Sequence, residues 1–180
     1  MPQIPLPVKP FVAKYIFARY QTEVWEINRQ ERIGKVIYAM LERYPLRKEK
    51  ELDLGAEVTL AISREYYRNK GIYLSNASVL SFNDFIQAEL IEEIAMYIYQ
   101  VKNRIGLKKY RELYIRHQLS KGERGQRVIV VKDPNVAQYF EQKEIIYDTL
   151  RLYHITEDDL PFDTVQKAVQ RLKLPLLMAS

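Results

Sequence analysis

Apolar residues recur every three or four positions along several stretches of the chain, which is the spacing of helices that bury one face. The first stretch opens at Pro10, a residue that favours the first position of a helix, and runs to Tyr20. The second extends from Glu31 to Tyr44 and is closed by Pro45. The third is capped by Ser81 and continues through Phe85, Ile86, Leu90, Ile94, Ala95, Ile98 and Val101. We expect this third helix to be the centre of the core.

Alternation of apolar and polar residues predicts only a small β element. Val58, Leu60 and Ile62 alternate, which indicates a strand over residues 57–63. A β-branched run over 127–132 favours a second strand that could pair with it, and residues 4–8 and 24–28 favour short extended pieces. Residues 64–78 are predicted to form a loop punctuated by Gly71, with a short extended piece over 72–74. The predicted fold is mainly α, a bundle-like helical domain with a small β element.

The chain after Asp133-Pro134 has a different pattern. Apolar spacing predicts a helix over 136–153, followed by two short capped helical pieces. Thr156 is predicted to cap the first piece with Asp159 at its third position, and Asp163 is predicted to cap the second. We therefore divide the chain into a helical core domain over 1–132 and a C-terminal helical segment over 133–180 that packs on it.

Composition narrows the function classes. The 180 residues include no cysteine, which excludes disulfides, zinc-thiolate sites and cysteine nucleophiles. The N-terminus lacks a signal peptide pattern, and no apolar run approaches the length of a membrane-spanning helix. These features favour a soluble, cytoplasmic protein that does not enter a membrane. The 14 tyrosines are many for this length; core and half-buried positions are expected for most of them, and interface positions for some.

Positive charge is concentrated in one segment. Residues 101–132 contain ten Lys or Arg and two Glu, a net charge of +8, whereas the remaining 18 cations and 21 acids give −3. Burying so many unpaired charges would be very costly, so most must face water or an anionic partner. Such a segregated field attracts polyanions. The ten cations are Lys102, Arg104, Lys108, Lys109, Arg111, Arg116, Lys121, Arg124, Arg127 and Lys132.

These residue types suit DNA or RNA. Arginine binds phosphate with two parallel hydrogen bonds, and lysine adds a point charge. Tyr110 and Tyr114 lie among the cations and could stack on unpaired bases. The alternative is a solvated helix and loop whose charge is neutralised within the fold, for example by Glu89, Glu92 and Glu93. A third interpretation is that the basic segment binds an anionic lipid or an acidic protein surface.

The last two helical pieces have the outline of a helix-turn-helix. The outer face of the second piece would carry side chains able to contact bases and phosphates, namely Thr164, Lys167, Gln170, Arg171 and Lys173. Glu157, Asp158, Asp159 and Asp163 oppose this interpretation because they would repel phosphate, and the turn lacks the expected glycine. A packed C-terminal hairpin is favoured over a DNA-reading motif.

Catalytic patterns are weak. His117 and His154 have no neighbours at metal-ligand spacing, and phosphate-binding glycine motifs are missing, so we expect no metal and no cofactor. Asp53, Glu57 and Lys132 could form a metal-dependent nuclease centre only under a strand pairing that the sequence does not reveal. We therefore expect a non-catalytic protein.

The sequence favours nucleic-acid binding in a regulatory, replication-accessory or mobile-element role, through phosphate contacts of the basic segment. The alternative is a structural or assembly subunit that uses a tyrosine-rich surface to bind copies of itself or another protein.

Overall fold

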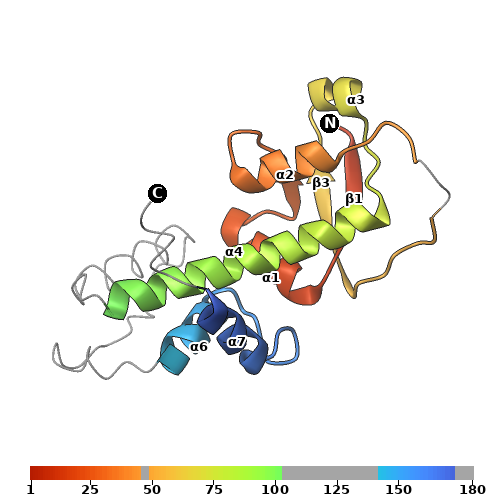
Figure 1. Cartoon of the computed structure of the whole chain (residues 1–180). Coiled ribbons are helices and arrows are strands. Elements are labelled where there is room, and N and C mark those ends of the chain that lie inside the picture. Colours follow the sequence, from red (N-terminus) through yellow and green to blue (C-terminus); the bar gives the residue numbers. More distant parts are fainter. Residues whose placement is uncertain (46–48, 103–141, 173–180) are drawn as a thin grey trace. The chain divides into compact units, whose positions relative to one another are not determined.

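The computed structural model describes residues 1–45, 49–102 and 142–172 (Figure 1). The described residues form six helices and one three-stranded sheet, so the fold is mainly α with a small β element, as predicted. A bundle-like arrangement of the helices is not confirmed. None of the described helices is both long enough and apolar enough to span a membrane.

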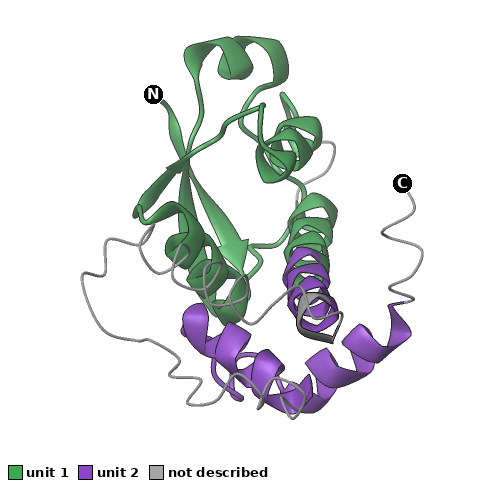
Figure 2. Cartoon of the chain, turned by 90° about the vertical axis from the view of Figure 1, so that its left-hand side faces the viewer, with its two compact units in different colours: residues 1–88 green, residues 89–180 purple. Residues whose placement is uncertain are grey.

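The chain clusters into two compact units, residues 1–88 and residues 89–180 (Figure 2). The division lies inside α4 (Asn76–Lys102), whose first half belongs to unit 1 and whose second half belongs to unit 2. The boundary predicted at residue 132 lies outside the described residues and stays a prediction.

The sheet of unit 1 has the order β1-β3-β2. Its centre is β3 (Ala56–Ala61), which confirms the strand predicted over 57–63. β1 (Gln3–Val8) runs antiparallel to β3, and β2 (Val24–Glu26) runs parallel to it. The partner predicted for β3 over 127–132 lies outside the described residues; both described partners were predicted only as short extended pieces.

Two prolines fit the edge position of β1. Ile4, Leu6 and Val8 are buried, whereas Pro5 lies opposite Thr59 and Pro7 opposite Glu57. Proline has no N–H, so within a sheet it is tolerated where its nitrogen faces away from the neighbouring strand. With Pro5 and Pro7 on the outer edge, β1 cannot offer a full hydrogen-bond ladder to another strand.

Helix α1 (Pro10–Tyr20) begins at Pro10 and packs on β3, as the helical spacing predicted. Phe11, Val12, Tyr15 and Ile16 are all buried in the core of unit 1. Trp25 on β2 is also buried, and its ring stacks on Tyr20 at 4.9 Å between centroids. Trp25 is the single tryptophan of the chain, so its fluorescence reports on unit 1.

Helix α2 (Arg32–Met40) is shorter than predicted, because Leu41 leaves the helical conformation. Tyr44 was expected on its apolar face, but it lies outside the helix and is 78% exposed. Gly34 explains the close packing of the first turn: a Cβ at this position would overlap the backbone carbonyl of Asn28. The glycine therefore lets the chain fold back tightly at the entrance to α2.

The predicted loop over 64–78 is wrong in its first half. Residues 64–70 form helix α3 (Arg64–Lys70), and the Ser63 side chain accepts a hydrogen bond from the Tyr66 N–H at its N-terminus. No residue of α3 is fully buried, so the apolar periodicity that normally indicates a helix is missing. The predicted extended piece is present only as an isolated bridge between Tyr73 and Glu42.

Helix α4 begins five residues before the predicted cap at Ser81. Ser75 caps it by accepting the Ser78 N–H, and Glu49 accepts the Asn76 N–H at 2.6 Å. Ser81 lies inside the helix and is exposed. The predicted inward positions Ile86, Leu90, Ile94, Ala95 and Ile98 are buried, so the apolar face is confirmed while the start was wrong.

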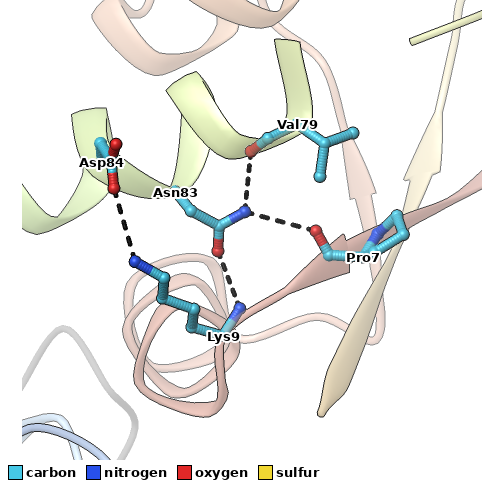
Figure 3. A network of polar contacts seen from close by, with 5 residues as sticks. All are labelled: Pro7, Lys9, Val79, Asn83 and Asp84. Carbon is cyan, nitrogen blue, oxygen red and sulfur yellow. Dashed lines mark hydrogen bonds and ion pairs between the residues drawn. The ribbon is translucent and has the colours of Figure 1, made fainter. Parts of the chain in front are cut away.

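Asn83 ties the start of α4 to the end of β1 (Figure 3). Its side chain is fully buried; it accepts the Lys9 N–H at 2.7 Å and donates to the carbonyls of Val79 and Pro7. The neighbouring Asp84 makes an exposed ion pair with Lys9 at 3.4 Å. The buried amide of Asn83 thus satisfies the backbone N–H of Lys9, the residue between β1 and α1.

Unit 2 contains α6 (Gln142–Leu152) and α7 (Phe162–Arg171). α6 lies within the helix predicted over 136–153, and α7 agrees with the second short piece, but the first short piece is a turn over 157–159 and not a helix. α6 ends in a Schellman motif: the Ile155 N–H bonds to the Leu150 carbonyl and the His154 N–H to the Arg151 carbonyl. His154 takes the left-handed position, with φ of 56°, that glycine usually occupies.

The turn between α6 and α7 follows the predicted capping only in part. The contribution of Asp159 is present, since its carboxylate accepts both the N–H and the hydroxyl of Thr156 at 2.7 Å, whereas the Asp159 N–H bonds to the Thr156 carbonyl. The prediction for Asp163 is wrong: Pro161 occupies the N-cap, and Asp163 lies in the first turn, where a negative charge is favourable. The Glu157 carboxylate accepts the Phe162 N–H instead.

Candidate nucleic-acid interface

The predicted basic segment falls almost wholly outside the described residues. Lys102 is the last residue of α4, and nothing is described of its side chain. The other nine cations, together with Tyr110 and Tyr114, lie in the range 103–141. Their part in binding therefore stays a prediction.

The predicted reading face of the C-terminal helix can be located on α7. Thr164, Lys167, Gln170 and Arg171 are all exposed, while Phe162, Val165 and Val169 on the same helix are buried. Lys173 lies outside the described residues. Phe162 stacks on Tyr147 of α6 at 4.5 Å between centroids, which packs the two helices together.

The charges around α7 do not favour phosphate. Residues 142–172 contain four Lys or Arg and six Asp or Glu, a net charge of −2. An acidic stretch repels a polyanion at the range over which surface fields act. The exposed face of α7 is therefore a weaker candidate than a surface with excess positive charge.

A stronger candidate lies in unit 1, at residues that the sequence pattern did not single out and of which some were predicted to form a loop. The rings of Tyr38 on α2 and Tyr66 on α3 meet edge to face at 4.8 Å between centroids. The Arg29 guanidinium lies 4.4 Å from the centroid of Tyr38 and 5.7 Å from that of Tyr66. The Lys70 ammonium lies 5.7 Å from the Tyr38 centroid. Two cations and two tyrosine rings thus form one cluster.

The chain after α2 runs directly beside α3. The guanidinium of Arg43 donates to the Arg68 carbonyl at 3.3 Å, and Glu42 exchanges backbone hydrogen bonds with Tyr73. Gly71 closes α3 with φ of 94° and ψ of −161°, a backbone conformation that is almost confined to glycine. A Cβ there would overlap the backbone of Glu42 and Arg43. Gly71 is therefore what allows this close approach.

We name this region the α2–α3 surface and define it by its cations and rings: Arg29, Tyr38, Arg43, Tyr44, Tyr66, Tyr67, Arg68 and Lys70. Residues 28–45 and 64–70, which contain it, carry seven Lys or Arg and three Glu, a net charge of +4. Their excess positive charge contrasts with the excess negative charge of residues 142–172.

Most cations of these two stretches have no acidic partner within the described part of the chain. Arg29, Lys35, Arg64, Arg68 and Lys70 make no ion pair there. Of the three acids, Glu31 is engaged by the Tyr20 hydroxyl at 2.6 Å. Burial, the hydrogen bond to Glu31 and the charge of Glu31 raise the pKa of Tyr20, so this hydroxyl stays a donor. The positive field of the α2–α3 surface is thus left largely unneutralised by its own neighbours.

The residues considered for a metal-dependent centre can be located in part. Within them, no three His, Asp or Glu side chains come close enough to hold a metal ion. Asp53, one of three residues considered for a nuclease centre, accepts the Gly55 N–H at 2.9 Å and shapes a turn. Glu57 is exposed on β3, and Lys132 lies outside the described residues.

Comparisons with models of known protein families, with curated proteins and with solved structures each found no match.

Proposed function

We propose that this protein is a non-catalytic nucleic-acid-binding protein. The observation that carries the proposal is the α2–α3 surface, where cations that have no acidic partner among the described residues lie against tyrosine rings. Phosphate contacts supply most of the affinity of such proteins, and aromatic rings can add base contacts. The combination distinguishes this surface from an ordinary solvated face, where cations and acids alternate.

Arg29 is well suited to bind phosphate. A guanidinium on a tyrosine face keeps its N–H groups in its own plane, so the edge of the plane can bind a phosphate while the ring holds the side chain in place. Less conformational entropy is then lost on binding than for an unsupported arginine. Lys70, on the same ring, adds a second positive charge beside it.

The basic segment over 101–132 extends the proposal. Its net charge of +8 would strengthen the attraction of the chain for a polyanion, with the ten cations named above as phosphate contacts and Tyr110 and Tyr114 as stacking residues. In this proposal the exposed face of α7 also contacts bases and phosphates. Because its surroundings are acidic, it is the weakest of the three proposed binding regions.

Fluorescence anisotropy with a labelled oligonucleotide tests the proposal. We expect binding that weakens steeply between about 50 mM and about 200 mM salt, because phosphate contacts release counterions. The double variant R29Q/K70Q should bind more weakly, with a salt slope lower by roughly 1 to 2. Lys9→Gln is the control: it removes one positive charge from a lysine that is already paired with Asp84. Trp25 fluorescence verifies that each variant keeps unit 1 folded.

Three results are informative. Absence of binding at the lower salt concentration would overturn the proposal. Salt-dependent binding that R29Q/K70Q leaves intact, but that K108Q/K109Q/R111Q abolishes, would keep the function and move the interface to the basic segment. Binding lost in R29Q/K70Q and kept in Lys9→Gln supports the α2–α3 surface.

A structural or assembly subunit is the second candidate. The observation in its favour is the exposure of two large tyrosines, Tyr44 at 78% and Tyr67 at 50%, since exposed aromatic side chains are enriched at protein interfaces. Light scattering at the concentrations of the binding assay distinguishes it: a stable oligomer that binds no oligonucleotide would favour assembly.

A further inference from the structure

Tyr44 and Tyr67 differ from the other tyrosines that the structure describes. Tyr15 and Tyr153 are buried, and the remaining seven are half-buried. Tyr67 is 50% exposed and Tyr44 is 78% exposed. Neither ring has an aromatic or cationic neighbour, and neither hydroxyl has a hydrogen-bond partner, among the described residues. The fold itself therefore makes little use of these two rings.

The two rings come from backbone segments that are held together. Tyr44 follows Arg43, whose guanidinium bonds to the carbonyl of Arg68, and Arg68 follows Tyr67. The bridge between Glu42 and Tyr73 fixes the same two segments at a second point. Two exposed rings are thus attached beside two arginines on one part of unit 1.

We infer that the α2–α3 surface binds single-stranded nucleic acid in preference to duplex, with the rings of Tyr44 and Tyr67 stacking on unpaired bases. The inference rests on the proposed function. In a duplex the base faces are already stacked on one another and are closed to a side chain on the protein surface. In a single strand they are open, and stacking on an aromatic ring stabilises the complex for any base. Arg29, Arg68 and Lys70 would contact the phosphates of either form.

The test compares three labelled probes of equal length: a thymidine DNA oligomer, a uridine RNA oligomer and a mixed-sequence DNA duplex. The single-stranded probes should bind more tightly than the duplex. A preference for either single-stranded probe supports the inference and identifies the polymer, because both offer open base faces.

Variants separate stacking from charge. Tyr44→Leu and Tyr67→Leu should each weaken binding of the single strands by roughly tenfold and leave duplex binding unchanged. Tyr44→Phe and Tyr67→Phe should retain binding, because the ring and not the hydroxyl makes the contact. R29Q/K70Q should weaken all three probes. Phe17→Leu, at an exposed ring on α1, is the control and should change nothing.

The outcomes distinguish this inference from the function on which it depends. Equal affinity for single strands and duplex, or single-strand binding that both leucine variants leave unchanged, would overturn the inference while nucleic-acid binding stands. Failure of all three probes at low salt would overturn the proposed function itself.

Discussion

The two units of this protein use similar residues in different ways. Both contain arginine, lysine, tyrosine and glutamate on helices. On the α2–α3 surface of unit 1, tyrosine rings contact cations, and most cations have no acidic partner among the described residues. In unit 2, the hydroxyls of Tyr97, Tyr147 and Tyr153 contact carboxylates, and the Lys143 ammonium lies 5.8 Å from the centroid of the Tyr147 ring.

The carboxylates of unit 2 serve the fold. Glu93 on α4 accepts the hydroxyls of Tyr153 at 2.6 Å and Tyr97 at 2.9 Å. Glu157 accepts the Phe162 N–H and, more weakly, the Tyr147 hydroxyl at 3.3 Å. These bonds satisfy helix ends and buried hydroxyls.

The role of a tyrosine in this protein therefore depends on whether its ring or its hydroxyl makes the contact. A ring that contacts a cation keeps that cation at the surface with its hydrogen-bonding edge available. A hydroxyl that contacts a carboxylate removes an acid from the surface and ties two elements together. A tyrosine-rich composition therefore predicts either an interface or a core, and the partner decides between them.

The largest effect should follow from changing the glycine that builds the α2–α3 surface. Gly71→Ala places a Cβ against the backbone of Glu42 and Arg43 in a conformation unfavourable for any other residue. We expect a loss of more than about 3 kcal/mol in the free energy of unfolding. Urea denaturation followed by Trp25 fluorescence measures it.

Gly55→Ala is the matched control. Gly55 also has a positive φ, of 88°, but a Cβ there would make only ordinary contacts with Pro10. Its cost should be near about 1 kcal/mol. If both variants lost the same free energy of unfolding, the close approach of Gly71 to the backbone of Glu42 and Arg43 would not be what stabilises the α2–α3 surface.

The second largest loss of stability should follow from removing the buried side-chain amide of Asn83. Asn83→Ala leaves the Lys9 N–H without its acceptor in a fully buried position and removes packed atoms (Figure 3). We expect a loss of about 2 to 3 kcal/mol. The neighbouring Asp84→Ala removes only an exposed ion pair and should cost less than about 0.5 kcal/mol. A small effect for Asn83→Ala would show that the β1–α4 junction does not depend on this amide.

In unit 2, removing a tyrosine hydroxyl tests how much its hydrogen bond to a carboxylate stabilises the fold. Tyr153 is 1% exposed, so Tyr153→Phe removes a buried hydrogen bond to a charged group. We expect a loss of about 1.5 to 2 kcal/mol, measured by thermal or urea denaturation with circular dichroism. Tyr99→Phe, at a half-buried tyrosine of the same helix as Glu93, should change stability little. If both variants behave alike, the contrast between the two units is weaker than the contacts indicate.

The smallest effect concerns pH. Burial raises the pKa of Asp148; Arg151 opposes the shift and Glu144 adds to it. A carboxyl whose pKa is higher in the folded state binds more protons folded than unfolded, so its charged form destabilises the fold once the pH exceeds the folded pKa. Asp148→Asn should therefore be more stable than the parent at about pH 7, and the advantage should shrink as the pH falls toward the ordinary carboxyl range.

Chemical denaturation of Asp148→Asn and the parent, at about pH 7 and at a pH within the ordinary carboxyl range, measures the difference in their free energies of unfolding. Asp158→Asn, which removes the same charge from an exposed side chain, is the control. An advantage of Asp148→Asn that stays constant with pH would contradict a raised pKa at Asp148.

The sequence by itself determined the parts of the fold that depend on periodic burial. The spacing of Ile86, Leu90, Ile94 and Ile98 indicated the buried face of α4, because a helix returns to one face every three to four residues. Alternation at Val58 and Leu60 indicated β3, and Pro10 indicated the start of α1. Each of these signals is local, so the chain itself contains it. The concentration of positive charge over 101–132 is equally a property of the sequence.

Only the tertiary structure decided where the described cations are left without acidic partners. α3 escaped prediction because none of its residues is fully buried, and periodicity reports burial. The start of α4 was misplaced in part because its first N–H, that of Asn76, is satisfied by Glu49, which lies 27 residues away in the sequence. The cluster of Arg29, Tyr38, Tyr66 and Lys70 joins residues up to 41 positions apart. Contacts of this kind arise when distant segments pack, and no pattern within one segment encodes them.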